Sequence, residues 1–177
     1  MIIREGDLKD LNACVLIDNS YVTDYVWQVQ AEERPYEEIV ITFRTVRLPR
    51  SMRVRSRRDT DYLLEDWQRE ECFLVAQEGD EIRGYLDMTV QAWHRTGWIN
   101  DMAVSKRYRH QGIGTALLRA ALRWAKDHEL RAVMLETQTK NYPAISFYQK
   151  HGFTFCGFND DYYTNQDIAV FFVYSLY

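Results

Sequence analysis

The sequence predicts an α/β (α+β) protein with a mixed, mostly antiparallel sheet that contains a central parallel strand pair around a β-α-β crossover. Short apolar segments separated by turn residues indicate an antiparallel meander over residues 72–104. A helical pattern over residues 112–128 then links two apolar strands, 98–104 and 131–138. A strand–helix–strand unit of this kind forms a right-handed crossover with parallel strands.

Composition and length indicate a globular chain that folds as one domain over residues 1–177. Hydrophobic residues make up 46% of the 177 residues and aromatic residues 14%, which is too apolar for a disordered chain. The formal net charge of −4 does not favour general binding to nucleic acid, and it mildly favours a cationic substrate.

The cysteines and the N-terminal segment give an expectation about the compartment. Cys14, Cys72 and Cys156 are widely spaced and form no C-x-x-C pair, so the sequence suggests neither a metal site nor a disulfide framework. We expect reduced thiols that are at least partly buried. The chain is charged from residue 4, and its apolar runs are shorter than a membrane span. We therefore expect a cytoplasmic protein without a membrane segment.

The N-terminal part shows weaker patterns than the rest of the chain. Residues 1–5 predict a short strand, and Asp7 is a suitable N-cap for a helix over residues 8–19. Residues 21–36 mix aromatic and acidic side chains and show no clear period. Residues 38–48 alternate in the manner of a strand.

An arginine-rich run extends from Arg44 to Arg58 and precedes a predicted helix over residues 59–71. One interpretation is a patch that binds anions or nucleic acid. The other is a charged face of an edge strand, whose arginines discourage pairing with other chains. The second is favoured because no aromatic platform interleaves with the arginines, so nucleic acid is not an expected partner.

The C-terminal part predicts a helix followed by two strands. Residues 143–150 form the helix, with Pro143 at its first position and Gly152 as its left-handed stop. Residues 153–158 and 168–177 predict strands that pair with each other. The aromatic last strand could pair with a second copy of the chain, giving a homodimer, or it could close its own sheet.

A basic turn that contains glycines joins strand 98–104 to helix 112–128. Gly112 and Gly114 let the backbone turn tightly, and the unpaired N–H groups at the helix start form an anion site with the helix dipole. The phosphate loop of nucleotide-binding proteins is excluded, because Gly114 is not followed by Lys and then Ser or Thr. The dinucleotide pattern G-x-G-x-x-G matches only in part, because its third position is Leu117.

The turn fits a third pattern, R/Q-x-x-G-x-G/A, completely. The residues that carry it are Arg109, His110, Gln111, Gly112, Ile113 and Gly114. This pattern is the acetyl-coenzyme A signature of the GNAT superfamily of N-acetyltransferases, which the chain resembles from about residue 70 onward. The resemblance implies that acetyl-coenzyme A (acetyl-CoA) is the cofactor and that its pyrophosphate lies on the turn from Arg109 to Thr115. We expect Lys106, Arg107 and Arg109 to add positive charge there.

The resemblance also implies a place for the rest of the cofactor. In the GNAT family the backbone at the end of the preceding strand pairs with the pantetheine arm and supplies a donor to the acetyl carbonyl. The corresponding residues here are Met102, Ala103 and Val104.

A second block, from Asn141 to Phe153, resembles the family pattern N-x-x-A-x-x-F-Y-x-x-x-G-F completely. In that family the tyrosine, here Tyr148, acts as the general acid near the cofactor sulfur. The asparagine, here Asn141, bonds the pantetheine arm or positions a water. A phenol suits the acid role, because its pKa of about 10 lies above the pKa of about 8.5 of a thiol, so protonating a desolvated thiolate is only modestly uphill. The alternative for Tyr148 is a packed helix aromatic.

Two carboxylates are candidates for the base that takes a proton from the amine. Glu136 follows apolar residues in mid-strand, where a carboxylate is unfavourable unless it is paired or faces a cleft. Burial there would raise the pKa of the Glu136 carboxyl group toward the range that suits base catalysis. Asp101, just before Met102, is expected at the mouth of the same cleft. Either carboxylate could instead be structural or anchor the substrate, and both would attract a cationic amine.

Within the family, residues 99–104, 134–138 and 169–174 look most like the streptothricin acetyltransferases. The resemblance implies acetyl transfer to a primary amine of a small cationic molecule, by direct attack in a ternary complex. Two alternatives stay open. One is acetylation of a protein N-terminus or lysine. The other is a non-catalytic module that binds a cofactor, or that binds nucleic acid through the arginine-rich run.

Overall fold

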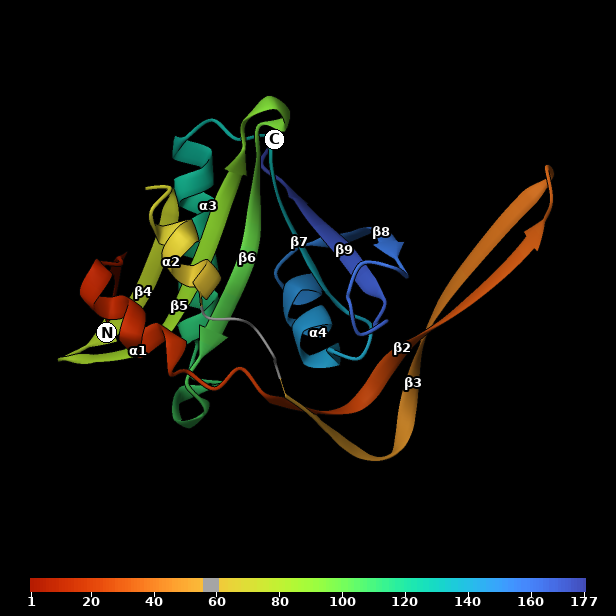
Figure 1. Ribbon diagram of the computed structural model, residues 1–177, viewed down its shortest axis with the longest axis horizontal. Coiled ribbons are helices and arrows are strands. Elements are labelled where there is room, and N and C mark those ends of the chain that lie inside the picture. The colour runs from red at the N-terminus through yellow and green to blue at the C-terminus, as the bar shows by residue number, and fades with distance from the viewer. Residues whose placement is uncertain (56–60) are drawn as a thin grey trace.

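A seven-stranded mixed sheet flanked by helices forms the body of the protein, and a two-stranded ribbon projects from it (Figure 1). The computed structural model describes residues 1–55 and 61–177. The strands are β1 (Ile2–Glu5), β2 (Tyr21–Arg34), β3 (Glu38–Val54), β4 (Cys72–Glu78), β5 (Glu81–Gln91), β6 (Thr96–Val104), β7 (Ala132–Gln138), β8 (Thr154–Asn159) and β9 (Ala169–Ser175). The helices are α1 (Leu11–Val15), α2 (Asp61–Trp67), α3 (Ile113–Asp127) and α4 (Tyr142–Lys150).

The strand order and directions confirm the predicted fold class. The seven strands follow the order β1-β4-β5-β6-β7-β9-β8. Neighbouring strands are antiparallel except β6 and β7, which run parallel and are joined through α3. This is the parallel pair around a β-α-β crossover that the sequence predicts.

Helices cover both faces of the sheet. On one face, α3 and α4 pack in a large buried cluster that includes Leu86, Ile99 and Leu135. On the other face, α1 and α2 pack over β4 and β5 through Leu11 and Leu63. We call these the α3 face and the α1–α2 face. Because successive residues of a strand point to opposite faces, the two clusters fix the direction of every side chain on β6 and β7.

A β-bulge interrupts the alternation on β6. Asn100 is an extra residue between the paired positions Asp87–Asp101 and Met88–Ile99. Simple alternation would turn Asp101 to the face of Ile99. The bulge turns Asp101 to the opposite face instead. The alternation of residues 102–104 is shifted in the same way.

The N-terminal helix is shorter than the predicted helix over residues 8–19. A 3₁₀ turn over Leu8–Asp10 leads into α1, which ends at Val15. The carboxylate of Asp18 then accepts a hydrogen bond from the backbone N–H of Ser20, with N and O 2.7 Å apart. Such a local bond gives the backbone an alternative to the helix, so the helix stops before it.

The prediction was least successful for residues 21–36, which show no clear period but mostly form β2. This strand pairs with β3, which continues past the predicted end at residue 48 to Val54. We call the ribbon of β2 and β3 the arm. The backbone N–H of Trp27 donates to the Thr139 carbonyl oxygen at 2.9 Å, which fastens the arm to the end of β7.

The arginine-rich run lies mainly on the arm. Four exposed arginines belong to β3, namely Arg44, Arg47, Arg50 and Arg53. Arg57, Arg58 and the start of the predicted helix over residues 59–71 lie outside the described residues. The described part of that helix is α2, and the indole of Trp67 donates to the Gly6 carbonyl oxygen at 2.8 Å.

The C-terminal elements agree with the prediction, including the left-handed Gly152 with φ of 89°. β9 lies between β7 and β8 and pairs with both. It therefore closes its own sheet, and its edges are not available to a second copy. No helix in the described part of the chain is long and apolar enough to cross a membrane.

The three cysteines differ in exposure. Cys14 and Cys72 are buried, and burial raises the pKa of each thiol to about 12. Cys156 is exposed, which corrects the expectation that all three thiols are at least partly buried.

Candidate active site

The predicted anion-binding turn lies between the end of β6 and the start of α3. Gly112 caps α3 in a left-handed conformation with φ of 86°, and a Cβ there would meet no described heavy atom within 4 Å. Glycine is therefore required for its backbone angle rather than for space. A Cβ on Gly114 would meet Phe147 at 3.5 Å, an ordinary contact. His110 and Gln111 are exposed beside these glycines.

The N-terminus of α3 presents backbone donors to this turn. The first N–H groups of a helix have no partner within the helix, and here they belong to Ile113, Gly114 and Thr115. The N–H of Ala116 donates to the Gly112 carbonyl oxygen at 2.9 Å. The side chain of Ile113 is buried and anchors the helix start in the core. With the helix dipole, these donors suit a pyrophosphate.

Arg109 supports the turn from within rather than facing outward. Its guanidinium donates to the carbonyl oxygens of Val104, Ser20 and Asp18, at 2.9, 2.7 and 2.6 Å. Burial lowers the pKa of Arg109 from its ordinary value. The residue ties the end of β6 to the segment that precedes β2, so its contribution is to position the turn.

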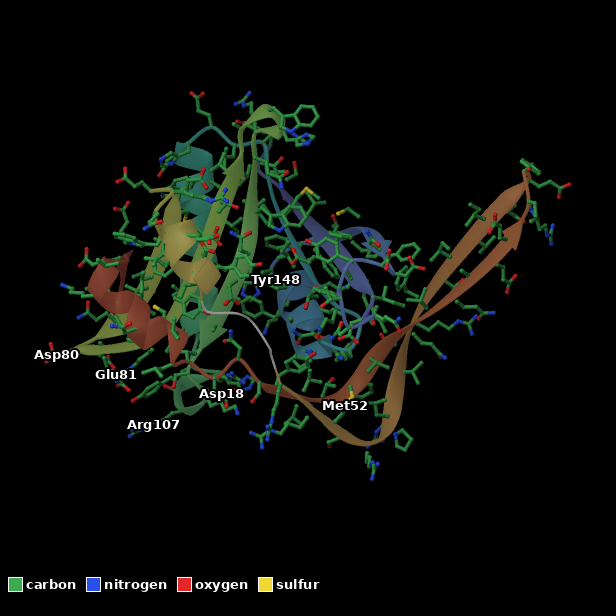
Figure 2. The ribbon with its side chains drawn as sticks, viewed as in Figure 1. Asp18, Met52, Asp80, Glu81, Arg107 and Tyr148 are labelled. Carbon is green, nitrogen blue, oxygen red and sulfur yellow. The ribbon has the colours of Figure 1, made fainter. Side chains whose placement is uncertain are left out.

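The other two cations predicted at the turn have different surroundings. Lys106 Nζ lies 2.5 Å from the Asp18 carboxylate and 2.6 Å from Ser20 Oγ. Its hydrogen bond holds the pKa of Asp18 well below the ordinary range. Arg107 is exposed and lies over the Tyr108 ring, with Cζ 5.5 Å from the centroid. Figure 2 shows Asp18 and Arg107 at the same edge of the molecule. Lys106 therefore holds the turn in place, while Arg107 leaves its charge at the surface.

Sequence reasoning missed His151, which links α3 to α4. Its Nε2 lies 3.0 Å from Thr115 Oγ1, and its Nδ1 lies 2.7 Å from the Phe147 carbonyl oxygen. The hydroxyl of Thr115 is engaged in this contact, so its backbone N–H is the group it can offer to an anion. A single histidine after a helix gives no periodic signal, because its role depends on a tertiary contact.

β6 and β7 separate between the turn and the centre of the sheet. Their parallel pairing joins Thr96–Ile99 to Ala132–Leu135 and ends there. Met102, Ala103 and Val104 lie beyond this stretch on β6. The side chains of Met102 and Val104 pack on the α3 face, and Ala103 is buried on the other. The backbone edge of β6 that diverges from β7 can therefore accept another extended chain (Figure 1).

Glu136 lies on β7, one residue beyond that pairing. It points to the α1–α2 face, because its neighbour Leu135 points to the α3 face. The indole Nε1 of Trp98 donates to its carboxylate at 2.9 Å. Trp98 packs against Phe171 with ring centroids 6.0 Å apart, which holds the indole in place. The indole takes up one of the roughly four acceptor positions of this carboxylate.

Asp101 points to the same face from β6 because of the bulge at Asn100. The hydroxyl of Tyr85 and the amide nitrogen of Asn19 donate to its carboxylate, the second at 3.4 Å. The structure therefore brings both candidate bases, Asp101 and Glu136, to one face of adjacent strands where those strands part.

A polar cluster that the sequence did not reveal holds the bulge. The amide nitrogen of Asn100 lies 3.2 Å from carboxylate oxygens of both Asp66 and Asp87, and 3.1 Å from Thr89 Oγ1. Asp87 is 2% exposed, and Asp66 comes from α2. This cluster fixes the backbone next to Asp101.

Tyr148 comes from α4 and lies on the α3 face of the sheet, opposite to the face of Asp101 and Glu136. Its side chain is 7% exposed and packs against Phe147 and Phe153, with ring centroids 5.3 and 5.4 Å apart. It belongs to the buried cluster that includes Ile99 and Leu135. Figure 2 shows it between α4 and β6.

Asn141 is the N-cap of α4. Its Oδ1 accepts a hydrogen bond from the N–H of Ala144 at 3.2 Å, and Pro143 lies in the first turn. This local role accounts for an asparagine at the position. The resemblance implies that Asn141 bonds the pantetheine arm or positions a water, and the N-cap bond engages its Oδ1.

Comparison with known proteins agrees with this geometry. The sequence profile of the Acetyltransferase (GNAT) family matches residues 33–153. Streptothricin acetyltransferase A of Bacillus subtilis (strain 168) is 42% identical over 87 residues, which are 47% of this chain and 50% of that protein. N-alpha-acetyltransferase 30 of Schizosaccharomyces pombe (strain 972 / ATCC 24843) is 35% identical over 96 residues, 52% of this chain and 62% of that protein. The match thus spans about half the length of these relatives.

Solved structures share the whole architecture. Nourseothricin acetyltransferase superposes with a TM-score of 0.84 at 22% identity, covering 99% of this chain and 98% of that one. A structure described as a streptothricin acetyltransferase from Bacillus anthracis str. Ames, in complex with acetyl coenzyme A, has a TM-score of 0.76 at 26% identity and covers 98% and 96% of the two chains. The chain belongs to the Acetyltransferase (GNAT) family.

Proposed function

We propose that this chain is an acetyl-CoA-dependent N-acetyltransferase that acetylates a primary amine of a small cationic molecule, such as a streptothricin-type antibiotic. One observation carries the proposal. The anion-binding turn at the start of α3 leads along the open edge of β6 to the place where Asp101 and Glu136 face the same side.

The residues of this chain fit the proposed cofactor. The N–H groups of Ile113, Gly114 and Thr115 would bind its pyrophosphate, and the open space beside Gly112 leaves room for it. The backbone of residues 102–104 would bind the pantetheine arm, which would lie along β6 like an added strand. When bound, the cofactor supplies the acetyl thioester.

The proton transfers are assigned to three side chains. Glu136, or Asp101 as its competitor, accepts a proton from the ammonium or attacking amine, directly or through a water. Tyr148 donates its hydroxyl proton to the departing thiolate. The amine nitrogen forms the new amide bond as the thioester carbon–sulfur bond breaks. The two carboxylates also attract a cationic acceptor, so they would contribute both to substrate binding and to proton transfer.

Two kinds of relative favour different acceptors. The streptothricin acetyltransferases are joined among the similar proteins by N-alpha-acetyltransferases, which include the Schizosaccharomyces pombe protein. The resemblance at residues 99–104 and 134–138 favours the small cationic acceptor. So do the carboxylates of Asp101 and Glu136, which lie on the same face of the sheet. A peptide N-terminus is the alternative that the experiment must separate from it.

The test is release of free thiol from acetyl-CoA, followed with a thiol reagent, against a panel of amines. The panel contains a streptothricin-type compound, a peptide with a free N-terminus and a lysine peptide with a blocked N-terminus. Cys156→Ser serves as the parent protein, because Cys156 is exposed and would react with the reagent. We expect the highest kcat/KM with the streptothricin-type compound.

Each other outcome has its own meaning. Turnover confined to the free N-terminus would replace the small-molecule acceptor by a protein. Failure to bind acetyl-CoA at millimolar concentration, measured by calorimetry, would reject the acetyltransferase. A salt-dependent shift of oligonucleotides without thiol release would indicate a nucleic-acid module instead.

A further inference from the structure

The segment that joins α1 to β2 passes the end of β6 and connects it to β7 (Figure 1). We call residues 18–21 of this segment the strap. The amide nitrogen of Asn19 donates to the Asp101 carboxylate on β6 at 3.4 Å, and the hydroxyl of Tyr21 donates to Gln138 Oε1 on β7 at 3.1 Å. Asp101 and Gln138 both point to the α1–α2 face. The strap therefore bridges the two strands on that face, beyond the end of their parallel pairing.

The strap is anchored to the anion-binding turn on both sides of Asn19. Lys106 contacts the Asp18 carboxylate and Ser20 Oγ, and Arg109 donates to the carbonyl oxygens of the same two residues. The backbone N–H of Ser20 also donates to the Asp18 carboxylate, and Ser20 is 4% exposed. Because both neighbours of Asn19 are held, its side chain extends from a backbone with little freedom to move.

The side-chain oxygen of Asn19 is an unusual feature of the strap. Oδ1 is buried, and it accepts no hydrogen bond within the described part of the chain. A buried carbonyl that has lost its water without finding a donor destabilises the folded state, and an apolar side chain of similar size would avoid that penalty. Stability therefore does not explain an asparagine here. The contact that accounts for it is the hydrogen bond from its amide nitrogen to Asp101.

Asp101 is directed by donors that come from different elements. The amide of Asn19 and the hydroxyl of Tyr85 on β5 both donate to the same carboxylate oxygen, Oδ2. Tyr85 is 3% exposed and stacks on Phe73 with ring centroids 6.1 Å apart, so its hydroxyl has a fixed position. Two fixed donors at one oxygen set the direction of the carboxylate.

The donors described for the two candidate carboxylates are uncharged. Asn19 and Tyr85 bind Asp101, and the indole of Trp98 binds Glu136. A lysine or arginine in place of these donors would bind its carboxylate more strongly, but it would also neutralise the carboxylate and compete with a cationic acceptor. A neutral donor orients the carboxylate without opposing its attraction for that acceptor.

We propose that Asn19 is a positioning residue for Asp101, whose directed carboxylate binds the ammonium group of the acceptor. This inference rests on the proposed acetyl transfer and extends it to a residue of the strap. Asn19 acts through the Asp101 carboxylate. Since the strap is anchored to the turn at the start of α3, it also holds this carboxylate in a fixed relation to the place proposed for the pyrophosphate.

Removing the amide donor tests the proposal. Asn19→Leu and Asn19→Ala, in the Cys156→Ser parent, should each raise KM for the streptothricin-type compound by about 3–10-fold, the effect of one ordinary hydrogen bond. The value of kcat and KM for acetyl-CoA should stay near those of the parent, as measured by thiol release. Asn12→Leu makes the same change at an exposed position of α1 and is the matched control. It should leave both KM values unchanged.

A double-mutant cycle separates positioning from a general effect on the fold. In the Asp101→Asn background the carboxylate is absent, so Asn19→Leu should change KM for the streptothricin-type compound by less than about 2-fold. An effect that keeps its full size in this background would show that Asn19 does not act through Asp101. That result would overturn the inference, and so would the parental KM in both Asn19 variants.

Thermal unfolding of the same variants gives a second readout. Asn19→Leu removes the buried oxygen that lacks a donor, so it should unfold at or above the temperature of the parent, whereas Asn19→Ala leaves a cavity and should unfold below it. Equal increases of KM in these two variants would show that the donor matters rather than the packing. An increase confined to Asn19→Ala would assign Asn19 to the fold alone and overturn the inference.

The parent protein distinguishes the failure of this inference from the failure of the proposed function. An active parent whose Asn19 variants keep the parental KM would contradict the role of Asn19 and leave the acetyl transfer in place. A parent that releases no thiol with any amine of the panel would remove the proposed acetyl transfer and this inference with it.

Discussion

The indole Nε1 of Trp98 on β6 donates a hydrogen bond to the Glu136 carboxylate on β7, with nitrogen and oxygen 2.9 Å apart. The bond crosses between the two parallel strands at the end of their pairing. It helps to fix the direction of the carboxylate. Glu136 therefore occupies a defined position at the opening between the strands.

Replacing each carboxylate by its amide should identify the base. Glu136→Gln keeps an oxygen that can accept from Trp98 but removes the basic group, so we expect kcat to fall by about 10²–10⁴-fold. Asp101→Asn should mainly raise KM for a cationic amine. Both are measured by thiol release with saturating acetyl-CoA. A larger loss of kcat in Asp101→Asn, with Glu136→Gln unaffected, would move the base to Asp101.

Tyr148→Phe should separate chemistry from packing. The ring contacts with Phe147 and Phe153 persist in the variant, so cofactor affinity and thermal unfolding should stay near those of the parent. Loss of the hydroxyl proton should lower kcat by about 10²-fold. Calorimetry gives the affinity, and thiol release across pH gives kcat. An unchanged kcat at every pH would leave Tyr148 with a packing role only.

Arg109→Lys should weaken the turn. One ammonium cannot reach the three carbonyl oxygens that the guanidinium spans, on Val104, Ser20 and Asp18. We expect the free energy of unfolding to fall by about 2–3 kcal/mol, together with a higher KM for acetyl-CoA. Urea titration and steady-state kinetics measure these. Arg107→Lys, at an exposed position, is the matched control and should change neither the stability nor KM by much.

Acid should destabilise the protein partly through Asp10. Arg4 donates to its carboxylate at 2.6 and 3.0 Å and holds the pKa of Asp10 below its ordinary value. The unfolded chain, with a pKa of about 3.9, binds this proton first as the pH falls. The stabilisation is therefore complete above about pH 5 and is lost below it.

Asp10→Asn provides the corresponding experiment. The variant should lose about 2 kcal/mol of unfolding free energy near neutral pH, because the buried end of an ion pair is removed. The difference from the parent should shrink as the pH approaches about 3. Urea unfolding at several pH values measures it, and a difference that stays constant with pH would contradict the ionic origin.

The main sheet could be predicted because its signals are local. The strands of the meander, the amphipathic α3 and the glycine turn each carry a pattern within one short segment, and α3 follows that pattern closely. The arm could not be predicted in the same way. Val22, Tyr25, Val26 and Trp27 put apolar side chains on both faces of β2, so no alternation is visible. Only pairing with β3 reveals the strand.

The sequence indicates the separate residues of the candidate site, but it does not indicate how they are connected. The types of Glu136 and Asp101 indicated acid–base chemistry, and the glycine turn indicated an anion. Which face Asp101 occupies depends on the extra residue Asn100, and the bulge appears only in the register with β5. The donors Trp98 and Tyr85 likewise become partners only after the strands are aligned, so no spacing in the sequence reveals them.

The order β7-β9-β8 has a consequence for how the protein is made. A nascent chain leaves the ribosome with β8 ahead of β9, yet β8 reaches the sheet only through β9. Until residues 169–175 have emerged, β8 has no strand of the seven-stranded sheet to pair with. We therefore expect this part of the sheet to complete its folding only after the last strand has been synthesised.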